Sequence, residues 1–119
     1  VAVVRQHAGD ARGRGAALFS GATASLRGGP SFAAFASAKF ALRGLAQALA
    51  REYSPRGVHV AHVVIDGLIE GAKTAARFGP AVSGRMDAAA LARTYLHLAL
   101  QERSAWTHEV DLRPAGEKF

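Results

Sequence analysis

Residues 15–67 hold the strongest structural signal in the chain and read GAALFSGATASLRGGPSFAAFASAKFALRGLAQALAREYSPRGVHVAHVVIDG. The stretch opens with a short apolar run that ends at Phe19, and a segment rich in glycine, serine and threonine follows up to Pro30. This pattern fits a buried strand that leads into a loop. Because ligands of open α/β sheets bind at the carboxyl ends of the strands, we expect this loop at a ligand-binding edge.

A long helix is predicted over residues 31–53. Apolar side chains recur with helical spacing on one broad stripe, which comprises Phe35, Ala38, Leu42, Leu45, Ala46, Leu49 and Tyr53. We expect Ser31 to cap the helix, and Pro55 with Gly57 to end it. The β-branched, almost continuously apolar run Val58–Ile65 then predicts a parallel strand that is covered on both faces.

The remaining segments complete an alternating pattern. Residues 1–8 carry apolar side chains at helical spacing and are interpreted as the end of a helix. Residues 68–85 are expected to form a loop with one short helix. Asp87 is expected to cap a helix over residues 88–101, and residues 106–112 alternate as in a last strand.

The order of these elements predicts an α/β fold with right-handed crossovers. We expect a Rossmann-like parallel sheet of about three strands with flanking helices, in a single domain over residues 1–119.

Composition excludes several classes of function. The chain has 119 residues, half of them apolar, which argues against disorder, and it contains no cysteine for disulfides or thiolate metal sites. The net charge is +6, but the arginines are scattered without interleaved aromatic residues, so no nucleic-acid partner is expected. No apolar stretch approaches the roughly 20 residues that span a bilayer, and no signal peptide is recognised. A cytoplasmic protein is therefore expected.

The segment over residues 15–67 resembles the catalytic half of the short-chain dehydrogenase/reductase family. In that family a serine-bearing loop follows a strand, and a tyrosine and then a lysine lie four residues apart on a long helix. Lys39 falls on the lysine position, within the stretch ASAKFALRGLAQALARE that is typical of this helix. The resemblance implies an oxidoreductase that interconverts carbonyls and alcohols with NAD or NADP. It implies that Lys39 binds the nicotinamide ribose, and that Asp66 and Gly67 lie in the loop over the nicotinamide.

The sequence departs from the family pattern at catalytic positions. Phe35 stands at the tyrosine position, and its ring has no hydroxyl that could pass a proton to a carbonyl oxygen. The serine position falls on Ala22, and we expect the nearby hydroxyl of Ser20 or Thr23 to hold a substrate carbonyl instead. The ordinary mechanism of the family is disabled at Phe35.

The glycine-rich phosphate loop of the family has no counterpart after a strand and before a helix in residues 1–119. The pair Gly13 and Gly15 precedes a strand, which is the wrong order. We therefore expect the dinucleotide-binding half to be absent, and the sequence does not predict that this chain alone binds a dinucleotide.

Three further hypotheses stay open. The chain could be a noncatalytic module that forms a homo-oligomer through the helix over residues 31–53, as members of the family often do. A hydrolase could combine Ser20, His62 and Asp66, although no G-x-S-x-G elbow supports it. Lys39 could be a solvated lysine and Phe35 a core residue. No metal is expected, because His59 and His62 lie three apart on a strand and point to opposite faces.

Overall fold

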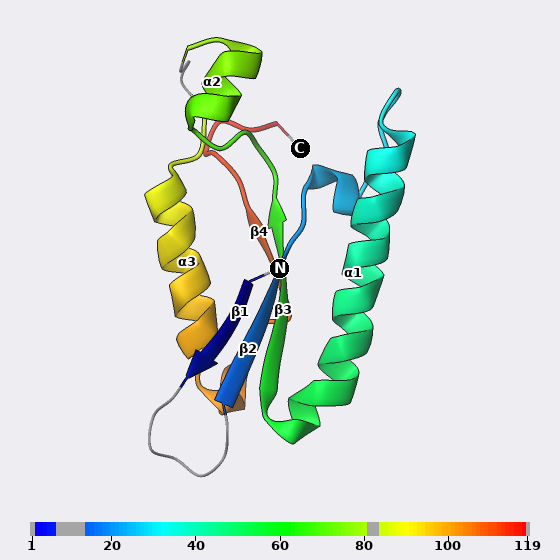
Figure 1. The fold of residues 1–119 in the computed structure, drawn as a ribbon, viewed down its shortest axis with the longest axis vertical. Helices are drawn as coiled ribbons and strands as arrows, with labels where there is room; N and C mark the ends of the chain where they lie inside the picture. The colour runs from blue at the N-terminus through cyan, green and yellow to red at the C-terminus, as the bar shows by residue number, and fades with distance from the viewer. Residues whose placement is uncertain (1, 7–13, 81–83, 119) are drawn as a thin grey trace.

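A four-stranded sheet forms the centre of the protein (Figure 1). The computed structural model describes residues 2–6, 14–80 and 84–118, with side chains except those of residues 2–6 and 14. The strands follow the order β1-β2-β3-β4, and β2 (Arg14–Ser20), β3 (Val58–Ile65) and β4 (Glu109–Leu112) run parallel. The predicted Rossmann-like parallel sheet of three strands is therefore confirmed.

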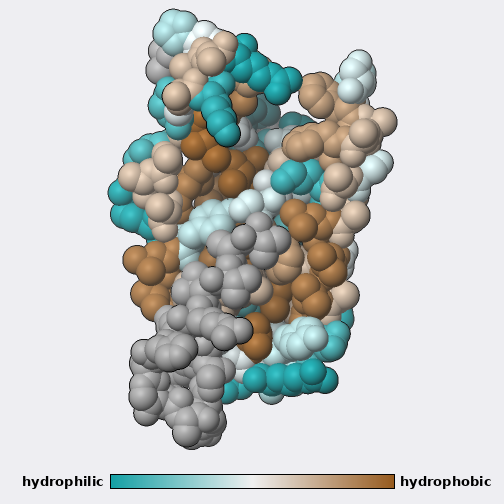
Figure 2. All heavy atoms as spheres, viewed as in Figure 1, coloured by the Kyte–Doolittle hydropathy of each residue, from teal (hydrophilic) through white to brown (hydrophobic). Residues whose placement is uncertain are grey.

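Two long helices cover opposite faces of this sheet (Figure 1). Helix α1 (Ala33–Tyr53) lies against one face, and α3 (Ala88–Leu100) lies against the other. The short helix α2 (Ala72–Phe78) lies beyond the carboxyl ends of the strands. Figure 2 shows apolar residues gathered along α1 and α3 on this side of the molecule.

Alternating side chains of β2 divide the core into two clusters. Leu18 points toward α3 and packs with Val63 and Leu98, whereas Phe19 points toward α1 and packs with Ala46 and Val60. All six side chains are at most 5% exposed. Successive residues of a strand face opposite sides of the sheet, so each strand contributes to both clusters. The mostly apolar character of β3, which also buries His59 and His62, follows from its place between two helices.

The predicted start of α1 is wrong in one detail. Ser31 has a left-handed backbone with φ of 66°, and Phe32 occupies the cap position without a side-chain cap bond. At the other end the prediction holds, because a 3₁₀ turn over Ser54–Arg56 closes the helix and Gly57 turns the chain with φ of 89°. Glycine adopts this conformation without a steric penalty.

The prediction of a helix near the amino terminus is wrong. The described part of that segment is strand β1 (Ala2–Gln6), which pairs antiparallel with β2 in a register that opposes Ala2 and Leu18. A segment this short satisfies a helical spacing by chance, and pairing with an open sheet edge supplies backbone hydrogen bonds that an isolated turn lacks.

The carboxyl-terminal elements match their predictions closely. Asp87 caps α3, since its carboxylate accepts hydrogen bonds from the backbone amides of Ala89 and Ala90 at 3.0 and 3.2 Å. The last strand is shorter than the expected residues 106–112: it begins at Glu109, three residues after a 3₁₀ turn over Arg103–Ala105. Within the described part of the chain, none of the helices is both long and apolar enough to cross a membrane.

Candidate functional site

A hollow of about 540 Å³ opens at the carboxyl ends of the parallel strands. Its walls come from the loop after β2, the first turn of α1 and the loop after β3, with a largely apolar lining. Its lining includes Ala22, Thr23, Phe35, Asp66, Gly67 and Leu68. This is the edge at which open α/β sheets bind ligands.

Lys39 lies on the second turn of α1 and reaches the same edge of the sheet. Its ammonium donates a hydrogen bond of 2.9 Å to the carbonyl oxygen of Ser20, the last residue of β2. The same ammonium lies 5.8 Å from the centre of the Phe35 ring, one helical turn away. The amine is therefore held at the rim and is only partly exposed.

Ser20 presents its backbone, and not its hydroxyl, to Lys39. The hydroxyl lies on the opposite face of the sheet, 2.7 Å from the hydroxyl of Tyr95 on α3. Burial raises the pKa of the Tyr95 phenol, and the hydrogen bond with Ser20 partly opposes this. Strand alternation explains the orientation, because Ser20 shares a face with Leu18, which packs against α3.

Thr23 and Asp66 form a polar pair beside the hollow. The Thr23 hydroxyl donates to one carboxylate oxygen of Asp66, and the Arg113 guanidinium lies 3.6 Å from the other oxygen. Asp66 is only 6% exposed, so these partners compensate the burial of its charge. Gly67 follows directly, and a Cβ there would lie 2.8 Å from the Pro114 ring. The loop over the hollow is thus packed against the carboxyl-terminal segment.

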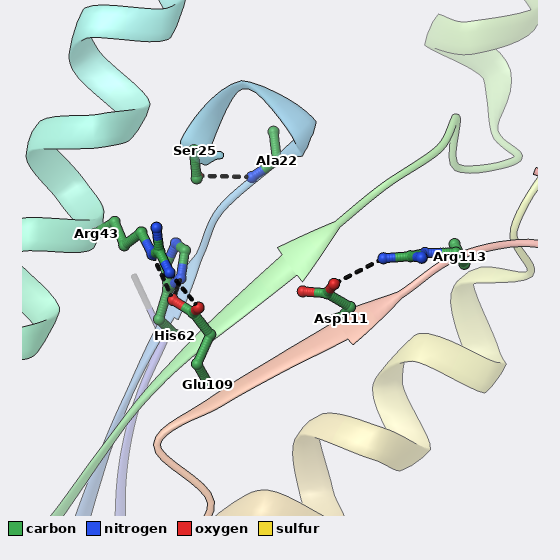
Figure 3. A network of polar contacts seen from close by, with 7 residues as sticks. All are labelled: Ala22, Ser25, Arg43, His62, Glu109, Asp111 and Arg113. Atoms are coloured by element: carbon green, nitrogen blue, oxygen red, sulfur yellow. Dashed lines mark hydrogen bonds and ion pairs between the residues drawn. The ribbon is translucent and has the colours of Figure 1, made fainter. Parts of the chain in front are cut away.

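A second polar network lies below the hollow, between α1 and the sheet (Figure 3). The Arg43 guanidinium donates two hydrogen bonds of 2.7 and 2.8 Å to the Glu109 carboxylate, and Nδ1 of His62 lies 2.9 Å from the same carboxylate. The hydrogen bond from Arg43 lowers the pKa of Glu109, against the opposing effect of burial, and His62 lowers it further. The hydrogen bond to Glu109 likewise raises the pKa of Arg43. Sequence reasoning missed this network.

Comparison with known proteins identifies the family. Residues 1–80 match the family described as short chain dehydrogenase. The chain belongs to the short-chain dehydrogenase family. A short-chain dehydrogenase from Rhodopseudomonas palustris is 48% identical over 85% of this chain, with a TM-score of 0.67. The match spans 39% of the length of that protein. A comparison with curated proteins found no match.

More distant members of the short-chain dehydrogenase family share the fold. An NADPH-bound short chain oxidoreductase from Pseudomonas aeruginosa PAO1, described as containing an atypical catalytic center, has a TM-score of 0.70 at 19% identity. This match covers 87% of the present chain and 46% of that protein. An alcohol dehydrogenase from the archaeon Thermococcus sibiricus, complexed with 5-hydroxy-NADP, has a TM-score of 0.68 at 20% identity. That match covers 87% of the present chain and 43% of that protein.

The structure contradicts the hydrolase hypothesis, because it does not bring Ser20, His62 and Asp66 together as a catalytic triad. The hydroxyl of Ser20 faces α3, whereas the imidazole of His62 faces α1 and bonds Glu109. Ser25 lies nearer to His62, but both side chains are fully buried and no substrate carbonyl can reach that hydroxyl. A nucleophile needs access to its substrate, so neither serine has the geometry of a catalytic triad.

Proposed function

We propose that this chain forms the nicotinamide-facing and substrate-facing part of a cytoplasmic NAD(P)-linked oxidoreductase that interconverts carbonyls and alcohols. One observation carries the proposal: the Lys39 ammonium is held 2.9 Å from the carboxyl end of β2, beside a largely apolar hollow that Phe35 lines. The 48% identity with a short-chain dehydrogenase supports it. Fold alone would not, because the same architecture serves many activities.

The residues around Lys39 fit the nicotinamide end of the cofactor. An ammonium has three donor hydrogens, and the Ser20 carbonyl takes one, so that two remain for ribose hydroxyls. Bound NAD(P) would supply the carbon that gives or takes a hydride. Structural relatives are known as complexes with NADPH, with 5-hydroxy-NADP and with NADH, so the proposal covers both NAD and NADP. Residues 1–119 offer no glycine-rich turn for the pyrophosphate, so we assign only the nicotinamide end to this chain.

The hollow fits a substrate with an apolar body and one hydroxyl or carbonyl group. Phe35 and Leu68 contribute apolar wall, whereas Thr23 offers an oxygen in the same lining. Because the Thr23 hydrogen is donated to Asp66, the remaining lone pairs of Thr23 are suited to accept a hydrogen bond from a substrate alcohol. Phe35 cannot exchange a proton, and its role in the proposal is to shape the hollow.

Cofactor binding tests the proposal directly. We expect millimolar NADPH to raise the melting temperature of the 119-residue chain, because a ligand that binds the folded state alone stabilises it by mass action. NADH should give a similar rise, because its nicotinamide end is the same. Adenosine monophosphate, which lacks the nicotinamide, serves as the matched control and should have little effect. If neither NADPH nor NADH shifts the melting temperature, the proposal for this chain is wrong.

The exposed face of α1 favours a second candidate, a noncatalytic module that assembles with a second copy. This face carries small and apolar side chains over several turns, and its exposed members include Ala34, Ala38, Phe40, Ala41, Leu45 and Ala48. Phe40 and Leu45 are 45% and 48% exposed. Small residues allow close approach of a second helix, and exposed apolar patches commonly mark interfaces. Light scattering should then show a dimer or larger species, and a monomer of 12.4 kDa would contradict this candidate.

A further inference from the structure

One row of side chains crosses the sheet directly beneath α1. Phe19, His62 and Glu109 are register partners on β2, β3 and β4. His62 is completely buried in this row, and Glu109 is partly exposed at its end. From α1, Arg43 donates two hydrogen bonds to the Glu109 carboxylate, as Figure 3 shows. The bidentate geometry fixes both the distance and the rotation of the helix relative to the sheet, which a single contact would not do.

Arg43 lies one turn after Lys39 on the same helix. Residues four apart lie on one face of a helix, so the rotation that Arg43 fixes also fixes the direction of the Lys39 side chain. Lys39 uses that direction to reach the Ser20 carbonyl at 2.9 Å. The network therefore controls the helix side of the Lys39 contact.

His62 supports the other side of the same contact. Gly21 follows Ser20 and packs so closely on the imidazole that an added Cβ would lie 2.2 Å from Nε2 of His62. Its amide donates a hydrogen bond of 2.7 Å to the carbonyl of Val63, which keeps the backbone in this place. Among the residues that the structure describes, Nε2 of His62 has no hydrogen-bond partner, so the ring is held by Nδ1 and by packing.

We infer that Arg43, Glu109 and His62 are positioning residues, which together hold the Lys39 ammonium and the backbone at Ser20 in the geometry required at the nicotinamide ribose. Arg43 acts through α1, His62 acts through Gly21, and Glu109 joins the two. The functional part of the inference rests on the proposed role of Lys39 as a cofactor contact. The geometric part concerns this chain alone and is measured without a cofactor.

Lysine reactivity tests the inference, because the chain has only Lys39, Lys73 and Lys118. Trace acetylation followed by mass spectrometry gives the reactivity of Lys39 relative to the exposed Lys73 and Lys118. In Glu109→Gln we expect this ratio to rise several-fold. The neutral amide cannot keep both charge-assisted hydrogen bonds with Arg43, so the Lys39 amine is released. Arg43→Lys, which keeps the charge but loses the fork, should give a smaller rise. Arg51→Gln, an exposed arginine on the same helix, is the control and should change nothing.

Backbone amide exchange across α1 separates positioning from simple stabilisation. The inference requires that the Lys39 ratio rises while the α1 amides stay protected. It is overturned if the ratio is unchanged in both variants, or if it rises only as far as the helix itself loses protection. NADPH added to the wild-type chain forms a separate arm: failure to shield Lys39 would count against the proposed function, whereas the variant ratios would still decide the positioning role.

Discussion

The Lys39 ammonium and the Ser20 carbonyl oxygen are joined by a hydrogen bond of 2.9 Å, which ties the second turn of α1 to the end of β2. The bond brings a positive charge to the rim of the sheet without burying it fully. It also holds the ammonium of a helical lysine at the ligand-binding edge of the sheet. The side chain spans the gap between two elements that pack through Phe19 and Ala46 below.

Lys39→Met removes this charge and keeps the length of the side chain. We expect the free energy of unfolding to fall by about 1 kcal/mol, because the lost hydrogen bond is charge-assisted but partly exposed. The rise in melting temperature with NADPH should largely disappear. Lys73→Met, on the exposed surface of α2, is the matched control and should retain that rise. A full NADPH response in Lys39→Met would exclude a cofactor contact by this amine.

Gly21→Ala should destabilise the fold by about 1–3 kcal/mol, the usual range for overpacking. The added Cβ would lie 2.2 Å from Nε2 of His62 and 2.8 Å from the Ser25 hydroxyl, and both side chains are completely buried. Gly44→Ala provides the contrast, because nothing lies within 4 Å of a Cβ at that helical position. That change should stabilise by about 0.5–1 kcal/mol. Urea unfolding of the two variants should therefore give shifts of opposite sign.

Acid should weaken the fold through Glu109. Its pKa in the folded state lies below the ordinary value of 4.5, chiefly because Arg43 donates to the carboxylate. The folded state therefore binds the proton less readily than the unfolded state, and the stabilisation is present above about pH 4.5 and is lost as the pH falls through the folded pKa. When urea unfolding is measured from pH 6 downward, the free energy of unfolding should fall less steeply in Glu109→Gln than in the wild type. Glu52→Gln, at an exposed position of α1, should follow the wild-type curve.

Asp87→Ala should cost about 1 kcal/mol of stability, the typical effect of losing a helix cap. The carboxylate accepts from the amides of Ala89 and Ala90, and alanine would leave both donors without this partner. Asp87→Asn retains an acceptor oxygen and should stay within a few tenths of a kcal/mol of the wild type. Equal losses in the two variants, measured by thermal unfolding, would show that charge and not capping matters at this position.

Periodicity was sufficient to predict the central elements of the fold. The run Val58–Ile65 is a strand as predicted, and the helix over residues 31–53 begins two residues later than expected. The helix is long enough for its spacing to identify it, whereas the strand was identified by its β-branched composition and its flanking Gly57 and Asp66-Gly67. Residues 1–8 are short, so their spacing could not distinguish a helix from strand β1, and pairing with β2 decided the outcome.

The site was predictable where it depends on local spacing and not where it depends on distant partners. Lys39 and Asp66 were expected at the carboxyl edge, and the structure brings both of them there. The hydroxyl of Ser20 was expected beside them, yet strand alternation from Leu18 turns it toward α3. Arg43 and Glu109 lie 66 residues apart, and no spacing rule links such a pair. The substrate and cofactor roles of Lys39, Ser20 and Asp66 stay predictions until they are measured.

A parallel β-bridge between Ile69 and Met86 closes the base of α2, with hydrogen bonds of 2.8 Å on either side of it. None of the residues in α2 is buried, although the chain that leads into it contributes Leu68 to the wall of the hollow. The side chains of α2 therefore take no part in the two hydrophobic clusters that pack against the sheet. Substitutions in α2 are therefore expected to leave the stability of the sheet almost unchanged.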